Sequence, residues 1–185
     1  MPSPAGHLLS GLIIAAVPTR DSKRITLKRL SLGAIAAAAP DLDMLLVYLG
    51  IDYFTAHRTF SHSIITALVV FLLLRGWDYL CMMRHYIIRV PYVMISACLL
   101  SHIGLDLLGE DSYGPKGLMI LWPYSTTFFH PDLNLFYSAF NSNGMVKPLR
   151  TLIWAGLWEF VIIGFMGLIV LFIGYYCSDK TKLRL

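Results

Sequence analysis

Residues 152–176 read LIWAGLWEFVIIGFMGLIVLFIGYY, an apolar run interrupted by a single charged side chain, Glu159. A helix needs about 20 mostly apolar residues to cross the roughly 30 Å hydrocarbon core of a bilayer. The run exceeds that length, and it is the cleanest apolar segment of the chain. It therefore predicts a transmembrane helix over residues 152–176.

The composition of the whole chain agrees with this segment. Of the 185 residues, 57% are hydrophobic and 14% are charged, and the mean hydropathy is +0.65. A soluble domain is about 45–50% apolar and about 25% charged. This composition excludes a disordered or nucleic-acid-binding protein, and 3 cysteines are too few for a disulfide scaffold. We expect a single membrane-embedded domain over residues 1–185.

Four further apolar segments precede the final one. The segments 30–49, 63–80 and 87–108 are strong, and the segment 6–17 is too short to span a bilayer unaided. An aromatic-rich loop over residues 109–150 separates the last two helices, and it either lies along the membrane surface or folds over a site. We therefore predict an all-α integral membrane bundle of about five helices, the first one short.

The distribution of basic residues predicts how the bundle is oriented. Of the 15 Lys and Arg residues, eleven fall on one side of the five expected crossings and four on the other. Lys and Arg are enriched on the cytoplasmic side of a membrane. We expect the N-terminus outside the cell membrane and the C-terminus in the cytoplasm, so the net charge of +4 reflects topology.

Several ionisable groups lie within or next to the expected spans, where they are costly unless they pair, bind a metal or line a pathway. In the expected topology all of them fall at the outer side of the membrane. They are His7, Asp41, Asp43, His57, His62, His102, Asp106 and Glu159.

The spacing of these groups shows which ones can act together. His102 and Asp106 are four residues apart, so they project from one face of a helix. Asp41 and Asp43 are two residues apart and would diverge on a regular helix, but Pro40 interrupts the helical hydrogen bonds just before them. Either a local break turns both carboxylates inward, or only one of them is a ligand. In the segment between them and the next span, Ser61 or Ser63 is a natural N-cap.

Imidazole and carboxylate ligands without thiolates suit Zn²⁺, Mn²⁺ or Fe²⁺. We expect one or two divalent ions, most simply zinc, with an Asp bridging if there are two. Taken singly, His102 with Asp106 or Asp41 could instead be ordinary interhelical hydrogen-bonded groups. Glu159 is a ligand, a partner of Arg150 or Arg58, or the lining of a water cavity, and His130 in the long loop is a weaker candidate.

The order of these motifs resembles a known family. An early His7 is followed by PDLD at 40–43, HRTFSHS at 57–63 and HIGLD at 102–106, with Gly114 and LWPY at 121–124 downstream. This arrangement, over roughly residues 5–125, resembles the YdjM-type membrane-bound metal-dependent hydrolases of bacterial inner membranes. A more distant similarity is to zinc-dependent phospholipase C and the P1-type nucleases. The chain lacks their downstream His-x-x-x-Glu pair, since Ala155 stands four residues before Glu159.

This resemblance implies a metal-dependent hydrolase, and the expected depth of the site implies a lipid or lipid-linked substrate at the outer, periplasmic face. Phosphoester cleavage by a metal-activated water is our first expectation, with a lipid amide or ester hydrolase as the alternative. The metal ligands would be His7, Asp41, Asp43, His57, His62, His102 and Asp106. The candidate catalytic residues are Asp41, Arg58 and Glu159. Arg58 would bind a phosphate, and whichever Asp is not fully coordinated would accept a proton from the water. A metal or proton-coupled transporter, or a scaffold stapled by its metal, would use the same cluster.

Overall fold

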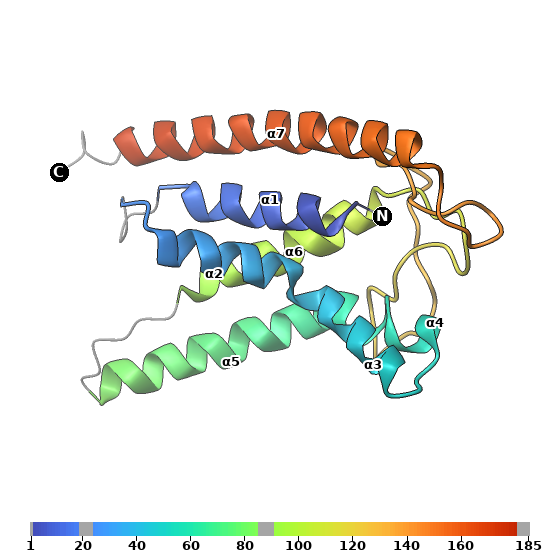
Figure 1. The fold of residues 1–185 in the computed structure, drawn as a ribbon. Coiled ribbons are helices and arrows are strands. Elements are labelled where there is room, and N and C mark those ends of the chain that lie inside the picture. The colour runs from blue at the N-terminus through green and yellow to red at the C-terminus, as the bar shows by residue number, and fades with distance from the viewer. Residues whose placement is uncertain (1, 19–23, 85–90, 181–185) are drawn as a thin grey trace.

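The computed structural model describes residues 2–18, 24–84 and 91–180, and in these ranges it is a helical bundle without β-strands (Figure 1). The expected all-α fold with five principal helical runs is confirmed. These runs are α1 Pro4–Ala16; α2 Leu27–Ala38, extended by η1 Ala39–Met44 and α3 Leu45–Tyr48; α5 Ile64–Met83; α6 Tyr92–Leu107; and α7 Leu149–Lys180. The short elements α4 Tyr53–Ala56 and η2 Phe60–His62 lie between α3 and α5. The expected start of the fourth span, at residue 87, is outside the described residues.

Three of the runs are long and apolar enough to cross a membrane: Leu27–Tyr48, Ile64–Met83 and Leu149–Tyr176. The helices α1 and α6 are also apolar but have only 13 and 16 residues. Large apolar side chains of α5 and α7, such as Leu73 and Phe172, point away from the protein interior. Long apolar surfaces of this kind are typical of helices that face lipid.

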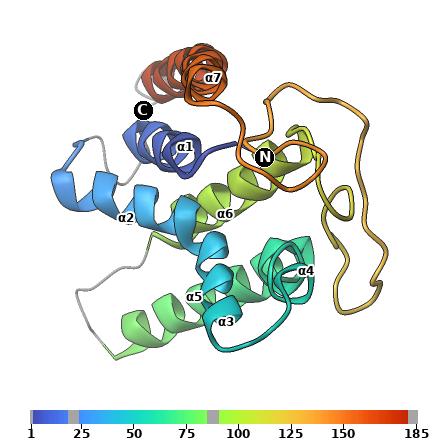
Figure 2. The ribbon, with the colours of Figure 1, turned by 45° about the vertical axis from the view of Figure 1, so that its right-hand side comes forward.

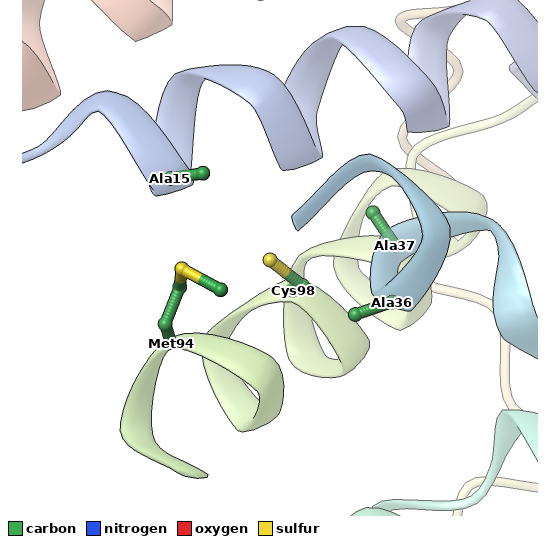
Figure 3. Packing of buried hydrophobic residues seen from close by; sticks show 5 residues of the cluster. All are labelled: Ala15, Ala36, Ala37, Met94 and Cys98. Carbon is green, nitrogen blue, oxygen red and sulfur yellow. The ribbon is translucent and has the colours of Figure 1, made fainter. Parts of the chain in front are cut away.

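The centre of the bundle is built from small side chains on α1, α2 and α6. Figure 3 shows Ala15 of α1 and Ala36 and Ala37 of α2 facing Met94 and Cys98 of α6, and all five are buried. Small residues let membrane helices approach closely, which increases their van der Waals contact.

The glycines of α1 and α2 allow an even closer approach. A Cβ atom on Gly11 would lie 2.3 Å from the carbonyl oxygen of Gly33, and one on Gly33 would lie 2.6 Å from the Cβ of Ala15. The helices therefore cross backbone to backbone, which fixes the position of α2 relative to α1.

The start of α1, the end of α6 and the start of α7 gather at one end of the bundle, beside α3 and α4 (Figures 1 and 2). The loop from Gly109 to Pro148 covers part of the same end. Its backbone bonds to the segment before α5: Met119 N–H donates to the carbonyl of Arg58, and Ile64 N–H donates to the carbonyl of Ile120, both at 3.0 Å. Backbone hydrogen bonds therefore attach the long loop to the segment before α5 at this end of the molecule.

Within this loop, Leu118 and Phe136 are buried, whereas Tyr124 is 89% exposed. The loop thus packs with its backbone on the bundle while several aromatic rings point outward, as expected for residues at the headgroup level. The loop is further held by Glu110, which accepts bonds from the Ser138 amide at 3.0 Å and the Ser112 hydroxyl at 2.8 Å. Burial raises the pKa of Glu110, but these bonds and Lys147 outweigh it and hold that pKa below its usual value.

Candidate metal centre

Four side chains from three segments converge on one point at this end of the bundle: Asp41 from η1, His62 from η2, and His102 and Asp106 from α6. Nε2 of His102 lies 3.1 Å from Nε2 of His62 and 3.3 Å from Oδ2 of Asp106. Oδ1 of Asp41 lies 3.4 Å from Nε2 of His102 and 3.7 Å from Nε2 of His62. Nε2 of His62 is also 3.3 Å from Oδ2 of Asp106.

These distances match the donor set of a tetrahedral ion. Zinc binds imidazole nitrogen and carboxylate oxygen at about 2.0–2.1 Å, so neighbouring donors at a tetrahedral site are about 3.3–3.4 Å apart. Five of the six separations among the four donor atoms run from 3.1 to 3.7 Å around that value. The donors therefore fit a divalent ion, and they combine the ligand types that zinc, manganese and iron accept.

The backbone of α2 determines the orientation of His102. Its Nδ1 lies 2.7 Å from the carbonyl oxygen of Ala37, which can only accept, so Nδ1 carries the proton and Nε2 presents a lone pair to the cluster. Pro40 explains why this carbonyl is available, because a proline has no N–H to donate to the carbonyls three and four residues before it. A backbone acceptor behind a histidine is typical of metal ligands.

Pro40 also explains how Asp41 and Asp43 reach the same histidine. In the 3₁₀ turn of η1 successive residues rotate by about 120° instead of about 100°, so residues two apart diverge by about 120° instead of about 160°. His62 lies between the two carboxylates: its Nε2 faces Asp41, and its Nδ1 is 3.3 Å from Oδ2 of Asp43. Both carboxylates therefore turn toward His62.

Asp43 belongs to a second group with His57 and His62. Oδ1 of Asp43 accepts from Nδ1 of His57 at 2.7 Å, and Oδ2 accepts a short hydrogen bond from the hydroxyl of Ser61. The Ser61 oxygen is also 2.9 Å from Nδ1 of His62. The N-cap of α5 is Ser63, which leaves Ser61 to bind Asp43.

His7 of α1 lies against the first group. Its ring stacks on that of His102 with centroids 3.8 Å apart, and its Nε2 is 3.2 Å from Oδ1 of Asp106. Both ring nitrogens of His7 and both oxygens of Asp106 are buried without a hydrogen bond from any described residue. Buried polar atoms without hydrogen-bond partners are rare in folded proteins, so the two Asp106 oxygens are consistent with a metal-ligating role.

The electrostatics of the site favour positive charge. Burial lowers the pKa of His62, but the carboxylates of Asp106, Asp41 and Asp43 outweigh it and raise that pKa well above its usual value. The buried carboxylates thus stabilise a cation at this point, either as a proton on the imidazole or as a metal ion.

The remaining expected site residues lie around this centre. The Glu159 carboxylate accepts from the amide of Ser3 at 2.9 Å and from its hydroxyl at 3.1 Å, so it holds the start of α1 and is in neither group. His130 lies 3.2 Å from the carbonyl oxygen of Gly109 in the long loop and is also in neither group.

Arg58, the expected phosphate-binding residue, is buried and its guanidinium lies 2.6 Å from Oδ1 of Asp111. It also donates to the carbonyl of Pro115 at 3.1 Å. No sequence pattern connects this pair, because Asp111 is in the long loop far along the chain from Arg58. The same holds for the Ala37 carbonyl, since a backbone group has no signature in a sequence.

Comparison with known proteins gives two matches. A family model described as the YdjM inner membrane protein matches residues 1–181. The inner membrane protein YbcI of Escherichia coli (strain K12) is 38% identical over 117 residues, which covers 60% of this chain and 62% of that relative. No solved structure matches the chain.

Proposed function

The chain belongs to the YdjM inner membrane protein family, and we propose that it is a membrane-bound metal-dependent hydrolase whose centre is formed by Asp41, His62, His102 and Asp106. The observation that carries this proposal is the near-tetrahedral spacing of four donor atoms, three of them on buried side chains. Zinc is our first assignment, because two imidazoles and two carboxylates at this spacing suit its preferred geometry.

A bound divalent ion that takes a water as an additional ligand beside the four donors would activate that water near neutral pH and would stabilise charge on a phosphoryl or acyl oxygen. The protein determines from which side a substrate can approach the ion. His62, His102 and Asp106 are enclosed, whereas the Asp41 side chain is 22% exposed, so the centre is accessible from the Asp41 side. Asp41 is therefore the ligand closest to an incoming substrate and the group we assign to accept a proton from the water.

The surroundings of Asp41 favour a lipid or lipid-linked substrate. Leu42, Leu45 and Tyr48, which follow Asp41 in the same helical run, are exposed, so this run presents apolar surface next to the segment that carries Asp41. A substrate with acyl chains would bury that surface while its headgroup meets the donors. Phosphoester cleavage is our first assignment, and cleavage of a lipid amide or ester is the alternative.

The proposed orientation places this centre at the periplasmic face and the C-terminus in the cytoplasm. It is supported by the excess of Lys and Arg on the opposite side. The start of α1 and the end of α7 also lie at opposite ends of the bundle (Figure 1). Reporter fusions at Met1 and Leu185 test it: we expect opposite sides, and two cytoplasmic signals would contradict it.

The activity is tested on vesicles of bacterial phospholipids that contain the full-length protein, with products identified by mass spectrometry. We expect cleavage by protein reloaded with zinc, none after chelation, and none by a folded His102→Gln variant. Asp132→Asn is the matched control, because that side chain is 92% exposed in the loop. Metal-loaded protein that leaves a panel of phospholipids, lipid amides and lipid esters intact would contradict the hydrolase assignment.

A further inference from the structure

The two groups of metal-capable side chains differ in their geometry. In the first, the distances between donors are those of atoms that surround an ion. In the second, Oδ1 of Asp43 is 2.7 Å from Nδ1 of His57, and the Ser61 hydroxyl is still closer to Oδ2. Such separations are hydrogen-bond lengths and are shorter than the roughly 3.3 Å expected between two ligands of a tetrahedral ion.

The second group also has a consistent order of donors and acceptors. A carboxylate only accepts, so the hydroxyl proton of Ser61 must point at Asp43. The Ser61 oxygen then has only lone pairs left for Nδ1 of His62, which lies 2.9 Å away. His62 must therefore carry its proton on Nδ1, and its Nε2 presents a lone pair to the first group.

We propose that Asp43, Ser61 and His57 are positioning residues that fix the ring and the tautomer of His62, and that they do not hold a second ion. This inference rests on the proposed metal centre and deepens it: the centre takes one ion. His62 is then oriented by a hydroxyl and a carboxylate, as His102 is oriented by the Ala37 carbonyl. Partners of this kind are found behind the ligands of many metal sites.

The division of roles between the two aspartates follows from η1. Asp41 and Asp43 lie on either side of His62, so one carboxylate meets Nε2 as a fellow ligand and the other meets Nδ1 as its support. Nδ1 of His57 donates to Oδ1 of Asp43, the oxygen that does not face Ser61, and so holds the Asp43 carboxylate in place.

The Asp43→Asn substitution tests this role. Because Nδ1 of His57 donates to Oδ1 of Asp43, the amide oxygen of the substituted side chain keeps that place and the amide nitrogen faces Ser61. The nitrogen then donates to the Ser61 oxygen, whose own proton turns to Nδ1 of His62. The His62 proton is thereby forced onto Nε2, where it opposes the ion. We expect affinity for the ion to fall by about 10–100-fold, with the ligand set unchanged.

The experiment titrates metal-free, full-length protein in detergent with Co²⁺ and records the visible spectrum and the stoichiometry. Wild type should bind one equivalent. Asp43→Asn should also bind one, more weakly but with the same band at saturation, whereas Asp41→Ala should change the band because a ligand is lost. Ser61→Ala should lose less affinity than Asp43→Asn, since Nδ1 of His62 remains 3.3 Å from Asp43. Asp132→Asn is again the control.

Two equivalents in wild type with one lost in Asp43→Asn would overturn the inference and leave the first centre intact. An Asp43→Asn band altered as in Asp41→Ala, or unchanged affinity, would also overturn it. No cobalt bound by wild type would overturn the metal centre itself. If Asp43→Asn does not fold, Ser61→Ala decides: weaker binding with an unchanged band supports the role, and wild-type affinity refutes it.

Discussion

The crossing of α1 and α2 allows a quantitative prediction from a single methyl group. In Gly11→Ala the new Cβ would lie 2.3 Å from the carbonyl oxygen of Gly33, whereas a normal carbon–oxygen contact is about 3.4 Å. The two helices must therefore separate by about 1 Å. Because the opposing atom belongs to a backbone, no side-chain rotation can relieve the contact.

Overpacking of this kind costs about 1–3 kcal/mol, and the better helix propensity of alanine returns up to about 1 kcal/mol. For a backbone contact we take the upper part of that range, which leaves a net loss of about 2 kcal/mol. In a chain of this length that corresponds to a fall in Tm of about 4–8 °C.

The control is Gly156→Ala in α7, where a Cβ would meet no atom within 4 Å. The same substitution should there stabilise the protein by about 0.5–1 kcal/mol. Thermal unfolding in detergent, followed by circular dichroism, measures both. Equal changes in the two variants, or a stabilised Gly11→Ala, would refute the close crossing of α1 and α2.

Three further predictions concern the loop and the start of α1. Asp111→Asn leaves the buried Arg58 guanidinium without its carboxylate, so thermal unfolding should show a loss of about 3–5 kcal/mol; an unchanged Tm would refute the ion pair. The pKa of Glu110 is held low in the folded protein, so its stabilisation is present above the unfolded pKa and is lost as the pH falls through the folded value. Glu110→Gln should thus lose up to about 1 kcal/mol at neutral pH, and a deficit that persists in acid would contradict this sign. Glu159→Gln keeps an acceptor for Ser3 but removes the charge at the start of α1, so the Tm should fall slightly while the metal content stays; metal loss would instead identify Glu159 as a ligand.

Much of the fold could be predicted from the sequence because membrane helices require long apolar runs. The final run fixed α7, and the missing N–H of Pro40 predicted a local change in the second span, which is the 3₁₀ turn η1. The four-residue spacing likewise predicted that His102 and Asp106 lie on one helix face, and both belong to the metal-capable group with Asp41 and His62.

The contacts between distant segments could not be predicted in this way. The partner of Glu159 is Ser3, which is 156 residues away, and the partner of Arg58 lies in the long loop. Such pairs depend on how the helices and the long loop pack, and the crossing of α1 and α2 at their glycines is one part of that packing. The close approach at Gly11 leaves no pattern in hydropathy, since glycine is also frequent in helices that pack loosely.

The most direct test of the account is the metal content of the full-length protein, measured by mass spectrometry after purification in detergent. Wild type should carry one divalent ion per chain, and His102→Ala and Asp106→Ala should carry almost none while they keep their helical content. Wild type that stays free of metal after resupply with zinc, manganese and iron would contradict the account. His62, His102 and the two carboxylates would then be the polar core of a membrane bundle.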